Sequence, residues 1–87
     1  MRINEDFIKE REKNECVLVP TGGKYQNGVF KLNETAERIY DLLCEGKTRE
    51  GMIDVLASEY ETKKEQVAEY VDAYIAQLKI IGVVLDD

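Results

Sequence analysis

The stretch Asn27-Gly28-Val29-Phe30-Lys31-Leu32-Asn33-Glu34-Thr35-Ala36 joins a turn, a strand and the start of a helix. Its first two residues favour a turn, because Asn and Gly both tolerate positive φ. The next four, residues 29–32, predict a short strand that alternates between two faces. Asn33 is a good helix N-cap, so a helix is predicted to begin where the strand ends.

The residues upstream of this stretch predict two more strands. Residues 7–12 alternate loosely, Lys13-Asn14 offers a turn, and residues 16–19 form a short apolar strand. Pro20 ends that strand, because proline has no backbone N–H to donate to a neighbouring strand. We therefore expect a three-stranded antiparallel sheet at the N-terminus, with glycine-rich turns between residues 21 and 28.

The residues downstream predict three helices. The first runs from Asn33 to a left-handed stop at Gly46, and the second follows Thr48 as its N-cap. Thr62 and Glu65 fit a capping box for the third helix, which ends at Gly82. Residues 83–85 form a short strand or pack on the core. This order indicates an α+β fold compatible with a winged helix-turn-helix.

The composition narrows the class of protein. The chain has 87 residues, a formal net charge of −6, two cysteines and no histidine. This length predicts a single domain, residues 1–87. The acidity opposes binding to a phosphate backbone, and the lack of histidine removes the commonest general base and metal ligand. Cys16 and Cys44 have no CxxC partner, so both are expected to be ordinary small core residues.

Targeting signals are not recognisable in the sequence. Residues 1–6 lack the apolar segment of a signal peptide, and no apolar run is long enough to span a membrane. We therefore expect a cytoplasmic location, with no membrane contact. We also expect no catalytic residue, no cofactor and no metal.

The opening stretch resembles the most recognisable segment of the PqqD-like family. In that family a glycine-containing turn leads through a short strand into Leu-Asn-x-Thr and the first helix, which here is Leu32-Asn33-Glu34-Thr35. The resemblance covers nearly the whole chain. The other matching segments are Val17-Leu18-Val19-Pro20, Tyr25, Ile39-Tyr40-Asp41-Leu42-Leu43, Glu45-Gly46-Lys47-Thr48 and Leu78-Lys79-Ile80-Ile81-Gly82-Val83-Val84.

The resemblance implies a function as well as a fold. The family is similar to the RiPP recognition element, whose members bind the leader segment of a ribosomally made precursor peptide. They deliver it to a modifying enzyme, often a radical SAM protein. The leader adds as a further strand beside the third strand and lies against the third helix. The peptide-binding positions that this implies are Val29, Phe30, Lys31, Leu32, Val67, Val71 and Ile75.

An edge strand favours the same mechanism on physical grounds. Its unpaired N–H and C=O groups are a template for another chain. Residues 29–32 contain no proline, although Lys31 is a residue that often protects such edges. Phe30 and Leu32 share one face and are expected in the core. Binding then rests on the backbone and on Val29 and Lys31.

The third helix offers side chains for both core and groove. Its apolar stripe, which includes Val67, Val71 and Ile75, can pack in the core, line the groove, or do both. Tyr70 and Tyr74 are candidates for the groove rim, because a tyrosine has an apolar body and a polar tip. They are equally compatible with half-buried surface rings. Glu65, Glu69 and Asp72 predict either a solvated face or a contact with Lys or Arg of the leader.

Two other functions stay open at this stage. A winged helix could bind DNA through its third helix, but Lys63, Lys64 and Lys79 compete there with the three acidic residues. Salt-dependent binding to duplex DNA would favour that function. An open strand edge could instead pair with a second copy to form a homodimer. Catalysis would need a further signal, such as an exposed cysteine with a depressed pKa.

Overall fold

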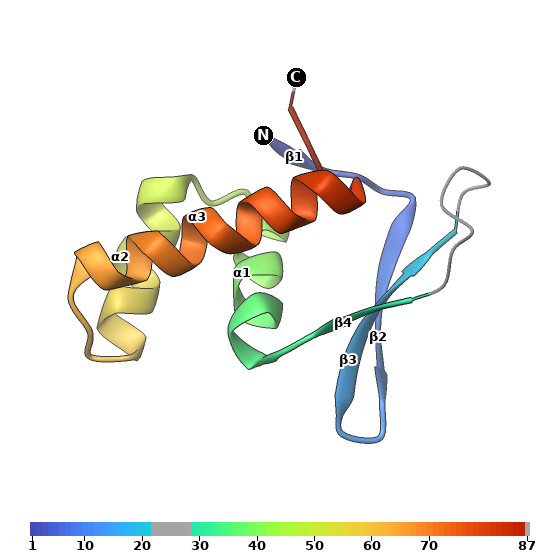
Figure 1. Cartoon of the computed structure of the whole chain (residues 1–87), viewed down its shortest axis with the longest axis horizontal. Helices are drawn as coiled ribbons and strands as arrows, with labels where there is room; N and C mark the ends of the chain where they lie inside the picture. The colour runs from blue at the N-terminus through green and yellow to red at the C-terminus, as the bar shows by residue number, and fades with distance from the viewer. Residues whose placement is uncertain (22–28, 87) are drawn as a thin grey trace.

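The computed structural model describes residues 1–21 and 29–86 (Figure 1). The turns predicted between residues 22 and 28, and Tyr25, lie outside the described residues. The predicted order of three antiparallel strands followed by three helices is confirmed. In chain order the elements are β1 (Arg2–Ile3), β2 (Phe7–Glu12), β3 (Glu15–Pro20), β4 (Phe30–Leu32), α1 (Glu34–Cys44), α2 (Arg49–Glu59), α3 (Lys64–Ile81) and β5 (Val84–Leu85).

β3 is the central strand of the sheet β2–β3–β4. β2 pairs with it from Phe7↔Pro20 to Glu12↔Glu15, and β4 pairs with it from Cys16↔Leu32 to Leu18↔Phe30. Opposed residues of antiparallel strands share a face. Phe7, Leu18 and Phe30 therefore lie together on the face turned toward the core, where the rings of Phe7 and Phe30 are 6.2 Å apart.

The core lies between this face of the sheet and the three helices. Each helix contributes one apolar stripe to this core. Phe30 and Leu32 pack against the core as half-buried residues, while Val29 and Lys31 are exposed, which confirms the predicted faces of β4. The fully buried side chains are Leu18, Ile39, Leu42, Met52, Leu56, Val67, Val71 and Val83.

The predicted caps of the first two helices are confirmed. Asn33 Oδ1 accepts the backbone N–H of Ala36 at 2.8 Å, and Thr48 Oγ1 accepts that of Gly51 at 3.1 Å. Gly46 and Gly82 follow α1 and α3 with φ of 85° and 98°, a conformation that glycine adopts without the steric cost of a Cβ.

The predicted capping box at the start of α3 is wrong. The N-cap is Lys63, which makes no side-chain cap hydrogen bond. Thr62 Oγ1 instead donates to the carbonyl of Tyr60 at 3.0 Å, within the turn that leaves α2. Glu61 in that turn has a φ of 49°, so the chain is still reversing direction at the point where the sequence suggested a cap.

A second, two-stranded sheet joins the ends of the chain, and the sequence pattern did not predict its first strand. β1 pairs antiparallel with β5. Of residues 83–85, for which a strand or core packing was expected, the last two form this strand. Asn4 is only 7 % exposed, and its Nδ2 donates to the Gly82 carbonyl at 2.9 Å. β1 and β5 accordingly lie near the C-terminal end of α3 (Figure 1).

The two cysteines differ in their surroundings. Cys16 is buried in β3, as expected, but Cys44 is exposed at the end of α1, so the prediction that it is a core residue is wrong. Desolvation raises the pKa of both thiols, through burial of Cys16 and through partial shielding of the Cys44 thiol, so both favour the protonated form near neutral pH.

Candidate functional site

β4 forms one edge of the three-stranded sheet. β3 pairs with one side of it, and no other strand of the described residues pairs with its outer side. Backbone N–H and C=O groups on that side are available to an incoming strand. β4 runs directly into one end of α1, and α3 passes in front of the other end of α1 in this view (Figure 1).

β2 forms the other edge, and its charges oppose pairing with a second copy. Lys9 and Arg11 share one face, while Glu10 and Glu12 share the other. Two copies of β2 joined antiparallel in one sheet would place residues of the same face opposite each other. Like charges would then meet across the join, which destabilises such a pair. This edge is therefore protected against self-pairing.

One flank of α3 is held against α2 by charged side chains. Arg49 forms two hydrogen bonds with the carboxylate of Asp72, at 2.7 and 3.0 Å, and Lys64 lies 2.9 Å from Asp54. Asp72 and Lys64 therefore mark the side of α3 that faces away from the sheet. The hydrogen bonds from Arg49 keep the pKa of Asp72 below its usual range.

The flank of α3 opposite Asp72 carries no charged residue. Its residues are identified from their sequence positions, because successive residues of a helix are rotated by about 100°. Tyr70 is 55 % exposed and Ile80 86 % exposed, so apolar surface reaches solvent along this side. Tyr74 shows that this side of α3 is turned toward β4, because Asn33 Nδ2 at the end of β4 donates to the Tyr74 hydroxyl at 2.6 Å. We call this side the neutral flank; its residues are Gln66, Tyr70, Ala73, Tyr74, Gln77, Ile80 and Ile81.

The structure brings together only some of the predicted site residues. Lys31 is exposed on β4, Val29 is exposed immediately before it, and Tyr70 and Tyr74 lie on the neutral flank. Val67, Val71 and Ile75, by contrast, are 2 %, 0 % and 8 % exposed and belong to the core. These three residues support the neutral flank from beneath.

The acidic residues of α3 do not lie toward β4. Asp72 is paired with Arg49 of α2, and Glu65 and Glu69 are exposed on the outer side of the helix. The predicted contact of these three carboxylates with a basic leader therefore finds no support in this geometry. Their position agrees with the other prediction, a solvated face.

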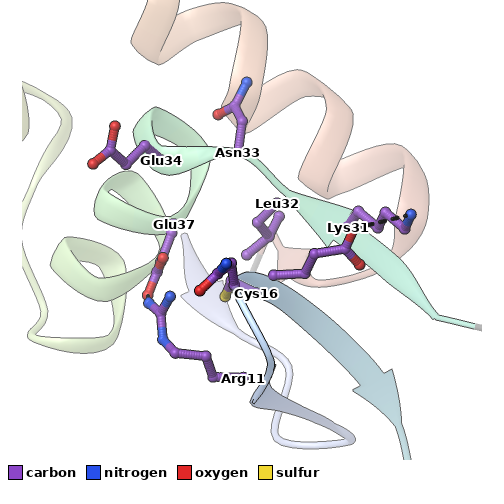
Figure 2. Close-up of a pocket in the computed structure, with 9 residues that line it drawn as sticks. Arg11, Cys16, Lys31, Leu32, Asn33, Glu34 and Glu37 are labelled. Atoms are coloured by element: carbon purple, nitrogen blue, oxygen red, sulfur yellow. Dashed lines mark hydrogen bonds and ion pairs between the residues drawn. The ribbon is translucent and has the colours of Figure 1, made fainter.

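An open pocket of about 630 Å³ lies on the α1 side of the sheet, near the end of β4 (Figure 2). Arg11 and Glu37 line it and are paired with each other, which lowers the pKa of Glu37. Cys16 lies at its base with a raised pKa. The pocket thus holds a satisfied ion pair and a protonated thiol, an arrangement without an activated nucleophile.

In residues 1–21 and 29–86, no group of three or more Cys, Asp or Glu is arranged to hold a metal ion. Among the same described residues, no helix combines the length and the hydrophobicity that crossing a bilayer requires.

An open strand edge beside a neutral helix flank, on a small winged-helix-like α+β domain, defines a binding protein rather than a catalytic one. The family model described as "Coenzyme PQQ synthesis protein D (PqqD)" matches residues 15–84. The chain therefore belongs to the PqqD family, as its sequence resemblance predicted. Proteins of this family are non-catalytic peptide-binding proteins, which confirms the prediction that the chain is not an enzyme.

A solved structure has the same fold. It is described as "TbiB1 in Complex with the TbiA(beta) Leader Peptide" and is 24 % identical in sequence, with a TM-score of 0.82. The match covers 99 % of this chain and 100 % of that chain, and it confirms the predicted winged-helix arrangement. No curated protein matches the sequence.

Proposed function

We propose that this protein binds the leader segment of a ribosomally synthesised precursor peptide by strand addition to β4. The observation that carries the proposal is the open edge of β4 beside the neutral flank of α3. Membership of the PqqD family supports it, as does the likeness to a protein whose solved structure contains a leader peptide.

In this proposal the leader lies between β4 and the neutral flank, where backbone and side chains have different roles. The backbone of residues 29–32 provides hydrogen bonds that depend little on the sequence of the peptide. Tyr70 and Tyr74 provide apolar surface with polar tips on the opposite wall. Val67, Val71 and Ile75 hold that wall in place from the core. Phe30 and Leu32 do the same for β4.

The bound leader is then presented to a modifying enzyme, for which the family resemblance suggests a radical SAM protein. Residues 1–87 act as one recognition domain in the cytoplasm, a location that family membership supports. Pairing of β4 with a second copy is the competing use of the same edge. It would give a homodimer that excludes the peptide.

An NMR titration tests the proposal. Isotope-labelled protein is titrated with synthetic leader peptides of the precursors encoded beside its gene. We expect shifts at residues 29–32 and along the neutral flank. Strand addition further predicts that N-methylation of alternate peptide residues abolishes binding, because only every second N–H points toward β4. Uniform tolerance of N-methylation, or shifts confined to other surfaces, would contradict strand addition.

Two exposed tyrosines provide a matched pair of variants. Tyr70 on the neutral flank is 55 % exposed, and Tyr60 after α2 is 45 % exposed. We expect Tyr70→Ala to weaken leader binding about fivefold or more, the loss typical of an aromatic anchor residue. Tyr60→Ala should bind normally in the same calorimetric titration. Equal effects of the two variants would place the peptide elsewhere.

A further inference from the structure

The side chain of Asn33 joins three elements and is held in one orientation. Its Oδ1 accepts the Ala36 N–H at the start of α1, at 2.8 Å. This bond fixes which end of the amide is the oxygen, so the nitrogen is turned toward α3 (Figure 2). Asn33 Nδ2 therefore donates to Tyr74, and the Tyr74 oxygen is the acceptor at 2.6 Å.

The Tyr74 hydroxyl consequently retains its own donor. A phenolic hydroxyl has one O–H to donate besides the lone pairs that accept. Asn33 occupies a lone pair, and among the described residues the hydroxyl donates no hydrogen bond of its own. The ring is half-buried, and its position is set by the bond to Asn33.

A strand added to β4 creates a need for such a donor. One edge of that strand pairs with β4, while its other edge faces the neutral flank of α3. The C=O groups on this second edge have no strand to pair with, and a buried carbonyl without a partner is costly. Tyr74 lies beside the end of β4 and projects its hydroxyl from the flank that those carbonyls face.

We propose that the Tyr74 hydroxyl donates a hydrogen bond to a backbone carbonyl of the bound leader strand, on the edge opposite β4. Asn33 positions the hydroxyl for this contact. This hydrogen bond involves no side chain of the leader. It therefore fixes the position of the strand along β4 for any leader sequence. This inference rests on the proposed function, because it requires a leader strand that is paired with β4.

Three variants separate this role from a structural one. Tyr74→Phe keeps the ring and removes the donor, and Tyr60→Phe makes the same change at a distant exposed site. Asn33→Ser retains a good N-cap and is too short to reach Tyr74. We expect Tyr74→Phe to weaken binding of the tightest leader peptide roughly threefold to tenfold, the worth of one hydrogen bond. Tyr60→Phe should change nothing, and Asn33→Ser should cost less than Tyr74→Phe.

Single thioamide replacements in the same peptide locate the acceptor, because sulfur accepts hydrogen bonds more weakly than oxygen. At one position the thioamide should weaken binding to the wild-type protein. The same thioamide should cause no further loss of binding to Tyr74→Phe. Unchanged affinity of Tyr74→Phe, or equal losses in Tyr74→Phe and Asn33→Ser, would overturn this inference while strand addition stands. Failure of the wild-type protein to bind any leader peptide would overturn both.

Discussion

At the scale of single residues, Glu37 of α1 forms ion pairs with two basic residues of β2. Lys9 Nζ lies 3.1 Å from Glu37 Oε2 and 2.7 Å from Asp41 Oδ1, and Arg11 also donates to Glu37. The hydrogen bond from Arg11 is the largest cause of the lowered pKa of Glu37, and the bond from Lys9 is the next. These contacts tie the sheet to α1 across more than twenty residues of chain, so no local pattern in the sequence could predict them.

A pH dependence follows from the lowered pKa of Glu37. The folded protein holds this carboxylate ionised more strongly than the unfolded chain does. Its contribution to stability is therefore full above the ordinary glutamate pKa of about 4.3 and is lost as the pH falls below that value. Glu37→Gln should lower the urea midpoint slightly at pH 7, with a smaller difference from wild type at pH 3.

Glu69→Gln is the control for that measurement, since Glu69 is exposed on the outer side of α3. It should leave the midpoint unchanged at both values of pH. A Glu37→Gln difference that is constant or grows as the pH falls would show that the ion pairs do not stabilise the fold.

At the scale of elements, the ends of the helices were partly predictable. Asn33, Thr48 and the two terminal glycines act through hydrogen bonds and dihedral angles within a few residues, so their residue types sufficed. The start of α3 was not predictable in this way, because Thr62 is engaged by the turn that reverses the chain after α2. Packing of α2 on α3 decides that turn.

The stop after α1 gives a prediction at this scale. Gly46 has a φ of 85°, and a Cβ added there would meet no atom within 4 Å. The cost of Gly46→Ala is therefore purely conformational, about 1–2 kcal/mol of unfolding free energy. Gly46→Asn should cost less, because asparagine adopts this conformation more readily. Urea denaturation of both variants checks the order, and equal losses would contradict it.

The two flanks of α3 are also an element-scale result. The 3.6-residue period identified the stripe of Val67, Val71 and Ile75, but it could not say whether that stripe faced a groove. The structure places it in the core, because α1, α2 and β5 pack against that side of the helix. The contact with Asn33 then assigns the neutral flank to β4.

At the scale of the whole molecule, Asn4 ties the first residues to the end of α3. Its backbone N–H donates to the Val83 carbonyl at 2.7 Å, and its Oδ1 accepts the Asp6 N–H at 2.9 Å. With the bond from Nδ2 to Gly82, both ends of the buried side-chain amide are hydrogen-bonded. Closure of the β1–β5 sheet depends on these contacts.

Asn4→Ala should therefore lower the free energy of unfolding by about 1–3 kcal/mol, since it leaves buried partners unpaired. Ser58→Ala, at an exposed position of α2, should change it by less than about 0.5 kcal/mol. Urea denaturation measures both, and amide exchange at Val83 and Val84 should accelerate only in Asn4→Ala. Equal stability of the two variants would show that the chain ends contribute little.

The sequence by itself determined the order of strands and helices, two of the caps, the faces of β4 and the PqqD family of the chain. All of these depend on residue type and spacing over a few positions, where propensity and periodicity act. Only the tertiary structure decided the β1–β5 sheet, the exposure of Cys44 and which flank of α3 meets β4. Contacts between residues far apart in the chain fix those features, because burial and charge pairing are satisfied across elements.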